Sequence, residues 1–178
     1  MKLSQLAVAL GLALASSCAL AAAGAAPNDA QIAAIVVTAN QVDIDAGQLA
    51  KSTSKSKEVQ EFAQLMITDH GSVNKSATEL VTKLHVTPET SPTSESLKSG
   101  GEQNLASLKK LNGHAFDKAY VDHEVTYHQA VLDAVDKTLI PSAKNAELKA
   151  LLVKVRPAFV AHLQHAKMLQ TSLAKSGG

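Results

Sequence analysis

Five ionisable residues interrupt otherwise apolar helical stripes, and their side chains could together bind a metal ion. They are Asp43, His70, Glu124, His128 and His162. Histidine nitrogens with one or two carboxylates suit zinc, iron, copper or manganese, and their spacing does not choose among these metals. We therefore predict a divalent transition-metal site built from imidazole and carboxylate groups.

Three further residues could orient the imidazole ligands of such a site. Asp69 and Asp117 would accept hydrogen bonds from the histidines, with Tyr120 nearby in the same polar layer. A metal-free alternative remains open, in which these groups form a buried hydrogen-bonded network that sets the register of the helices.

The elements that must position these residues are four long segments with apolar residues at three- and four-residue steps. The spacing predicts helices over residues 28–51, 56–85 and 114–139, and a fourth that starts at Ser142 or Asn145. Pro141 is expected to end the third helix. A rise of 1.5 Å per residue puts the five ionisable residues at similar depths, roughly 20 Å from one end.

A long polar connection, residues 86–113, separates the second and third predicted helices. It is rich in Pro, Ser, Thr and Gly, and we expect only a short helical piece in it, around Leu105, Leu108 and Leu111. A connection of this length can run along the whole molecule, so that the helices on either side of it are parallel. The predicted fold class is therefore all-α, a ferritin-like four-helix bundle with a long crossover between helices 2 and 3.

The first 21 residues have the pattern of a cleaved secretory signal peptide. Lys2 precedes an apolar run, and Ala19-Leu20-Ala21 provides small residues for cleavage. Residues 22–178 would then form one domain, with its core at about 28–174, in the periplasm or outside the cell. Cys18, the only cysteine, would leave with the signal peptide; lipid anchoring at Cys18 is the alternative.

Composition argues against several classes of function. Aromatic residues make up 3% of the chain and Arg156 is its only arginine, so we expect no nucleic-acid partner. No Gly-rich phosphate loop or nucleophile elbow occurs. No transmembrane segment is expected after signal removal, and a protein partner or homo-oligomer is left open.

Three segments resemble the bacterial Domain of Unknown Function 4142 family over about residues 30–173. They are FAQLMITDH at 62–70, FDKAYVDHEVTYH at 116–128 and RPAFVAHLQHA at 156–166. The resemblance implies a secreted ferritin-like bundle of a kind often labelled outer-membrane protein, with no agreed activity. Its matching positions are Asp69, His70, Asp117, Tyr120, His128 and His162.

The chain departs from metal-oxidising ferritin relatives because it contains no Glu-x-x-His pair. Its polar layer is poorer in carboxylate and richer in imidazole than a di-iron site, which disfavours ferroxidase chemistry. We therefore expect a non-enzymatic metal-binding protein with a stress- or metal-related role. The alternatives are a structural or partner-binding bundle and, more weakly supported, a metal-dependent redox enzyme.

Overall fold

The computed structural model describes residues 26–176, which fold into helices joined by short turns, with no strand among them. The predicted signal peptide and Cys18 lie outside the described residues. The elements, in chain order, are α1 (Asp29–Thr53), α2 (Lys57–Lys83), α3 (Pro92–Leu108), α4 (Gly113–Ala134), the π-helix η1 (Val135–Leu139), α5 (Ile140–Ser142) and α6 (Ala146–Ser176).

Local signals in the sequence define where these helices begin. Asn28 caps α1 in a capping box, because its side chain accepts from the Gln31 N–H while Gln31 bonds back to the Asn28 N–H. Ser56 accepts from the Val59 N–H at the start of α2. Asn145 accepts from the first N–H groups of α6. Each of these side chains satisfies a donor that the helix itself leaves without a partner.

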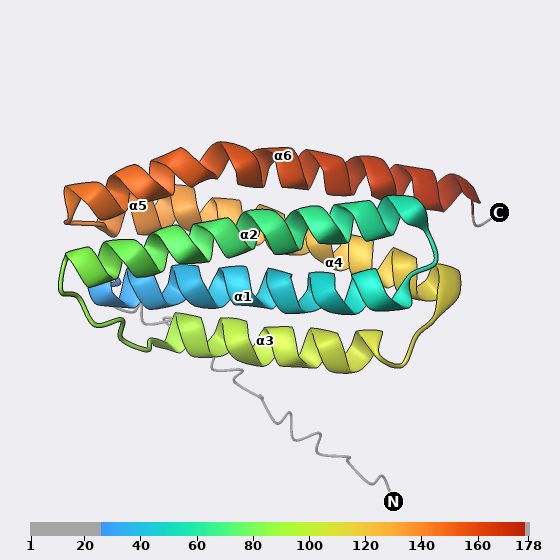
Figure 1. Cartoon of the computed structure of the whole chain (residues 1–178), viewed down its shortest axis with the longest axis horizontal. Helices are drawn as coiled ribbons and strands as arrows, with labels where there is room; N and C mark the ends of the chain where they lie inside the picture. The colour runs from blue at the N-terminus through green and yellow to red at the C-terminus, as the bar shows by residue number, and fades with distance from the viewer. Residues whose placement is uncertain (1–25, 177–178) are drawn as a thin grey trace, which may run out of the picture.

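The helices lie lengthwise beside one another, and α2 and α4 run in the same direction (Figure 1). Contacts at the two ends establish these directions. At one end, Lys83 of α2 pairs with Glu147 in the first turn of α6. At the other end, His114 in the first turn of α4 lies 3.0 Å from the Leu173 carbonyl, near the end of α6. Both α2 and α4 are therefore antiparallel to α6.

The connection between α2 and α4 contains a full helix, α3, where we expected a short helical piece. Ser91 caps α3 and Pro92 occupies its first turn, both favourable positions for these residues. Gly100 and Gly101 lie inside this helix, and Gly101 has a packing role. A Cβ at Gly101 would lie 2.7 Å from Cγ2 of Val42, so only glycine lets α3 approach α1 this closely.

The region around Pro141 also differs from expectation, because the helical path continues past this residue. The chain widens into the π-helix η1, in which the Ile140 N–H bonds to the Val135 carbonyl, and then enters α5. Pro141 lacks an N–H and its ring crowds the carbonyl four residues earlier, which a wider turn accommodates. Arg156 of α6 holds this turn in place through a bidentate ion pair with Asp136. Its Nε and Nη2 donate to Oδ1 and Oδ2 of Asp136 at 2.6 and 2.7 Å.

The apolar interior consists of two clusters, one toward each end of the helices. One includes Ile32, Val73 and Leu152, and the other includes Phe62, Phe116 and Leu169. Positions between the two clusters along each of α1, α2, α4 and α6 carry buried polar side chains. The polar layer therefore crosses the molecule near its middle.

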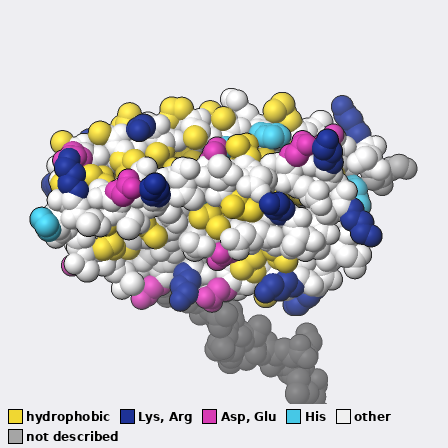
Figure 2. Space-filling view, in the orientation of Figure 1, with side chains coloured by type: hydrophobic (Ala, Val, Ile, Leu, Met, Phe, Trp, Pro, Cys, Tyr) yellow, Lys and Arg dark blue, Asp and Glu magenta, His cyan; other side chains and the backbone are white. Residues whose placement is uncertain are grey.

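The described surface is mixed in charge on the face shown in Figure 2, where Lys and acidic side chains are interspersed. No helix within residues 26–176 combines the length and apolarity that crossing a membrane requires.

The two adjacent glycines of α3 provide a matched test of how closely α3 packs on α1. We expect Gly101→Ala to lower the free energy of unfolding by about 1 kcal/mol or more, because overpacking at Val42 outweighs the gain in helix propensity. Gly100→Ala adds a Cβ where nothing lies within 4 Å, and should raise the same free energy by roughly 0.5–1 kcal/mol. Urea denaturation measures both. Equal changes in the free energy of unfolding for the two variants would show that α3 does not pack on Val42 in solution.

Candidate metal centre

All five residues that the sequence analysis proposed as metal ligands meet in the central layer. Each helix that lines the layer contributes at least one of them, and α4 contributes two. Their side chains are almost fully excluded from solvent; the residues are Asp43, His70, Glu124, His128 and His162, each at most 2% exposed. Two overlapping sets bring candidate ligand atoms within 4.8 Å of one another, His70/His128/His162 and Asp43/Glu124/His128.

Each of the three imidazoles uses one ring nitrogen in a hydrogen bond. Nδ1 of His70 lies 2.7 Å from Oδ1 of Asn40, and Nδ1 of His128 lies 3.1 Å from the Glu124 carbonyl oxygen. Nε2 of His162 lies 2.9 Å from Oδ2 of Asp69. Because these oxygens only accept, the bonded nitrogen of each ring carries the proton.

The other nitrogen of each ring therefore presents a lone pair to the interior. These atoms are Nε2 of His70, Nε2 of His128 and Nδ1 of His162. All three are buried and have no hydrogen-bond partner among residues 26–176. Metal-binding histidines show this arrangement, in which a hydrogen bond at one nitrogen orients the ring and the other nitrogen coordinates.

The two carboxyl groups of the layer also hold atoms without hydrogen bonds. Both carboxyl oxygens of Glu124, and Oδ1 of Asp43, lack a partner within the described part of the chain. Oδ2 of Asp43 lies 3.4 Å from Nε2 of His70, and Oε2 of Glu124 lies 3.4 Å from Nδ1 of His128. Buried carboxyl oxygens without partners are costly, so the layer favours a cation that would bind them.

Among the residues that the structure describes, the layer lacks a buried positive charge that would balance its acidic groups. Burial raises the pKa of Glu124 to about 8, and burial together with the nearby Glu124 charge raises the pKa of Asp43. Burial lowers the pKa of His70 to about 2, helped by repulsion from His128 and His162. No Lys or Arg is buried in residues 26–176. The layer on its own therefore favours neutral forms, whereas a divalent cation would favour carboxylates and neutral imidazoles, the forms that bind metals.

The three residues predicted to lie around the ligands and orient the imidazoles, Asp69, Asp117 and Tyr120, differ in their positions. Asp69 bonds to His162, as predicted for an orienting carboxylate, and its side chain is 38% exposed. Asp117 and Tyr120 are buried on α4, but no hydrogen bond joins either to an imidazole in the described residues. They precede Glu124 by two turns and one turn of helix, or about 10 and 6 Å along the axis, which places them beside the layer.

Two contacts of His70 were missed by sequence reasoning. Asn40 accepts from its Nδ1, and the Phe159 ring stacks on the imidazole at a centroid distance of 5.3 Å and an angle of 7°. Asn40 comes three residues before Asp43 on α1, so the same helical spacing that selected Asp43 could have found it.

Comparison with known proteins gives one match. A family model described as "Domain of unknown function (DUF4142)" matches residues 14–169. No curated protein and no solved structure matches the chain.

The lowered pKa of His70 and the raised pKa of Glu124 predict how the stability of the metal-free protein depends on pH. Below pH 6.5 the unfolded state binds a proton at His70 that the folded state does not, so stability falls as the pH falls. Between pH 4.5 and 8 the folded state keeps a proton on Glu124 that the unfolded state has lost, so this contribution falls as the pH rises. Above pH 6.5 the His70 effect is absent, and the contribution of Glu124 falls as the pH rises, in the same direction as that of Asp43, whose pKa is also raised.

We therefore expect the free energy of unfolding of chelator-treated protein to decline from about pH 6.5 to 8, and Glu124→Gln to flatten this decline. Urea denaturation across pH 4 to 9 measures it. Glu61→Gln is the control, because that side chain is 66% exposed. A decline that persists unchanged in Glu124→Gln would contradict the assignment.

Proposed function

The chain belongs to the DUF4142 family, and on that premise we propose that it is a secreted, ferritin-like metal-binding protein whose central layer holds one divalent transition-metal ion. His70, His128 and His162 would supply nitrogen ligands, with carboxylate oxygens from Glu124 and Asp43. The observation that carries the proposal is the set of three buried imidazole nitrogens, each with a free lone pair and each on a ring oriented through its other nitrogen.

The ferritin-like assignment rests on the course of the chain. α1 with α2, and α4 with α6, form two antiparallel pairs, and α3 carries the chain back along α1 before α4 begins (Figure 1). The buried polar side chains lie at mid-length of these four helices. Secretion rests on the pattern of residues 1–21 alone. In this setting the protein would bind or buffer a metal rather than oxidise it, because the chain contains no Glu-x-x-His pair and its layer is richer in imidazole than a di-iron site.

The structural alternative is a metal-free polar layer that fixes helix register. The raised pKa values of Asp43 and Glu124 favour it, since protonated carboxyl groups can be buried without a cation. The two hypotheses differ in what a chelator does: only a protein that binds metal loses stability when the metal is removed.

Metal content and thermal stability test the proposal directly. Protein purified after expression of the full chain should contain about one equivalent of a first-row transition metal by mass spectrometry. Its Tm should fall after chelation and recover when zinc or manganese is added back. His128→Gln should lose the bound metal and the response to chelator.

His85→Asn is the matched control, because it removes an exposed histidine, and asparagine tolerates the positive φ of 53° at that position. It should behave as the unsubstituted protein does. The metal-binding proposal is wrong if the purified protein contains no metal and its Tm changes neither with chelator nor with added metals. The register hypothesis would then remain.

The half-exposed Asp69 tests the role of the orienting hydrogen bonds. Asp69→Ala leaves every proposed ligand in place but removes the acceptor from Nε2 of His162. We expect metal affinity, measured by competition with a coloured chelator, to fall by about 10- to 100-fold. Asp45→Ala removes an acid of the same helix as Asp43 that bonds to Gln41 and not to the layer, and should leave affinity unchanged. Equal losses in both variants would indicate a general charge effect.

A further inference from the structure

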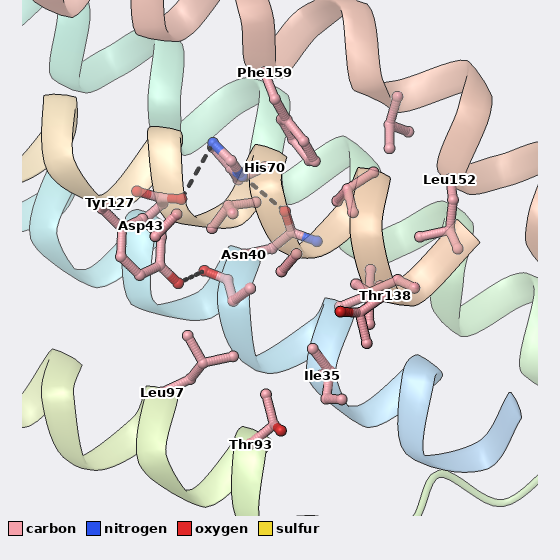
Figure 3. Close-up of a pocket in the computed structure, with 18 of the residues that line it drawn as sticks. Ile35, Asn40, Asp43, His70, Thr93, Leu97, Tyr127, Thr138, Leu152 and Phe159 are labelled. Carbon is pink, nitrogen blue, oxygen red and sulfur yellow. Dashed lines mark hydrogen bonds and ion pairs between the residues drawn. The ribbon is translucent and has the colours of Figure 1, made fainter. Parts of the chain in front are cut away.

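A cavity of about 280 Å³ adjoins the polar layer and has walls that are almost entirely apolar. It lies between α1, the first turns of α3, α4 with η1, and α6 (Figure 3). Its walls include Ile35, Leu97, Val135, Leu152 and Phe159, and no Lys or Arg lines it. The exposed Thr93 and Thr138 also line it, whereas Asn40 and His70 are buried. An apolar cavity of 150 Å³ is large enough for benzene, so this one accommodates a molecule of about ten non-hydrogen atoms.

Among the buried lining atoms without a hydrogen-bond partner, Nδ2 of Asn40 is the amide donor, whereas Nε2 of His70 and Oδ1 of Asp43 face the polar layer's proposed metal. Asn40 is 2% exposed, and its Nδ2 makes no hydrogen bond to any described residue. Its Oδ1 bonds to His70, which fixes the amide so that Nδ2 points away from His70 and toward Thr138 and Leu152 (Figure 3). The Tyr127 hydroxyl, by contrast, already donates to the Ala39 carbonyl. A buried N–H directed into an apolar space is satisfied when a ligand supplies an acceptor oxygen.

We propose that this cavity binds a small, uncharged, mostly apolar molecule whose carbonyl or hydroxyl oxygen accepts a hydrogen bond from Nδ2 of Asn40. The apolar walls bind the body of the molecule, and the one amide donor orients its oxygen. A carboxylate would lie close to Asp43 with no cation in the lining to offset its charge, which disfavours an anion. An ammonium group cannot accept a hydrogen bond, so it would leave the N–H of Asn40 without a partner, which disfavours a cation at that position.

The π-helix η1 gives this wall of the cavity its shape. Val135 and Leu139 of η1 are buried and line it, together with Thr138. Single π turns inside α-helices occur frequently at functional sites, because the extra residue per turn shifts side chains that a regular helix would align. The turn that accommodates Pro141 thus also lines the binding space.

A set of four similar-sized aromatic probes tests the proposal: acetophenone, ethylbenzene, benzoate and benzylammonium. Each is titrated into ¹⁵N-labelled protein purified after expression of the full chain, treated with chelator, and followed by NMR. Acetophenone should bind about tenfold more tightly than ethylbenzene, and both more tightly than the two ions. Acetophenone should also shift the side-chain NH₂ resonances of Asn40. Because the protein is metal-free, a failure of the metal proposal leaves this result unaffected.

Two variants separate the polar and apolar parts of the site. Asn40→Leu should abolish the advantage of acetophenone over ethylbenzene while ethylbenzene still binds. Ala134→Leu fills the cavity from α4 and should weaken both neutral probes by tenfold or more, whereas Ala115→Leu, at an exposed position of the same helix, should not. The proposal is overturned if acetophenone does not bind, if benzoate binds more tightly, or if ethylbenzene equals acetophenone in the unsubstituted protein. Circular dichroism confirms that each variant folds.

Discussion

The structure depends on a balance between the burial of ionisable groups and the aliphatic core around them. An uncompensated carboxylate in an apolar interior is strongly unfavourable, and a neutral carboxyl or imidazole without partners still costs roughly 1–3 kcal/mol per group. Here five such side chains meet at mid-length, between two clusters of Ile, Leu, Val, Ala and Phe. An apolar layer of the same shape would be cheaper to fold. Stability alone therefore does not account for the polar layer, and the proposed metal would offset its cost.

The direction of the helices decides which helix ends are neighbours, whereas the layer would lie near mid-length with α4 in either direction. If α4 ran antiparallel to α2, Glu124 and His128 would still lie near mid-length, but the ends of α4 would exchange neighbours. The contacts of His114 with Leu173, and of Lys83 with Glu147, occur because α3 carries the chain along the molecule before α4 begins. α3 can lie flat against α1 because Gly101 faces Val42 without a side chain. A glycine that supplies no group to the layer thus helps to place α4, which supplies two of its five residues.

Sequence reasoning succeeded where one-dimensional spacing carries the information. Ionisable residues at matching depths on four apolar stripes led to the five residues of the layer. Polar residues that can cap a helix placed the first two starts at Asn28 and Ser56 and left Ser142 or Asn145 for the last, of which Asn145 is the cap. It failed where the deciding fact is a distance between elements. The Gly-containing connection was expected to hold only a short helical piece, and the full helix α3 is explained once Val42 is known to lie beside Gly101. Pro141 reads as a stop until the π turn before it is known.

Asn40 shows how the two inferred sites depend on one side chain. An amide has an acceptor and a donor at opposite corners of one plane, and here the acceptor holds His70 while the donor faces the cavity. A ligand that accepts from Nδ2 polarises the amide and makes Oδ1 a stronger acceptor, which strengthens the bond to Nδ1 of His70. A stronger bond at Nδ1 makes Nε2 a more basic ligand. An occupied cavity would therefore favour metal at His70, and by linkage a bound metal would favour the ligand by the same factor.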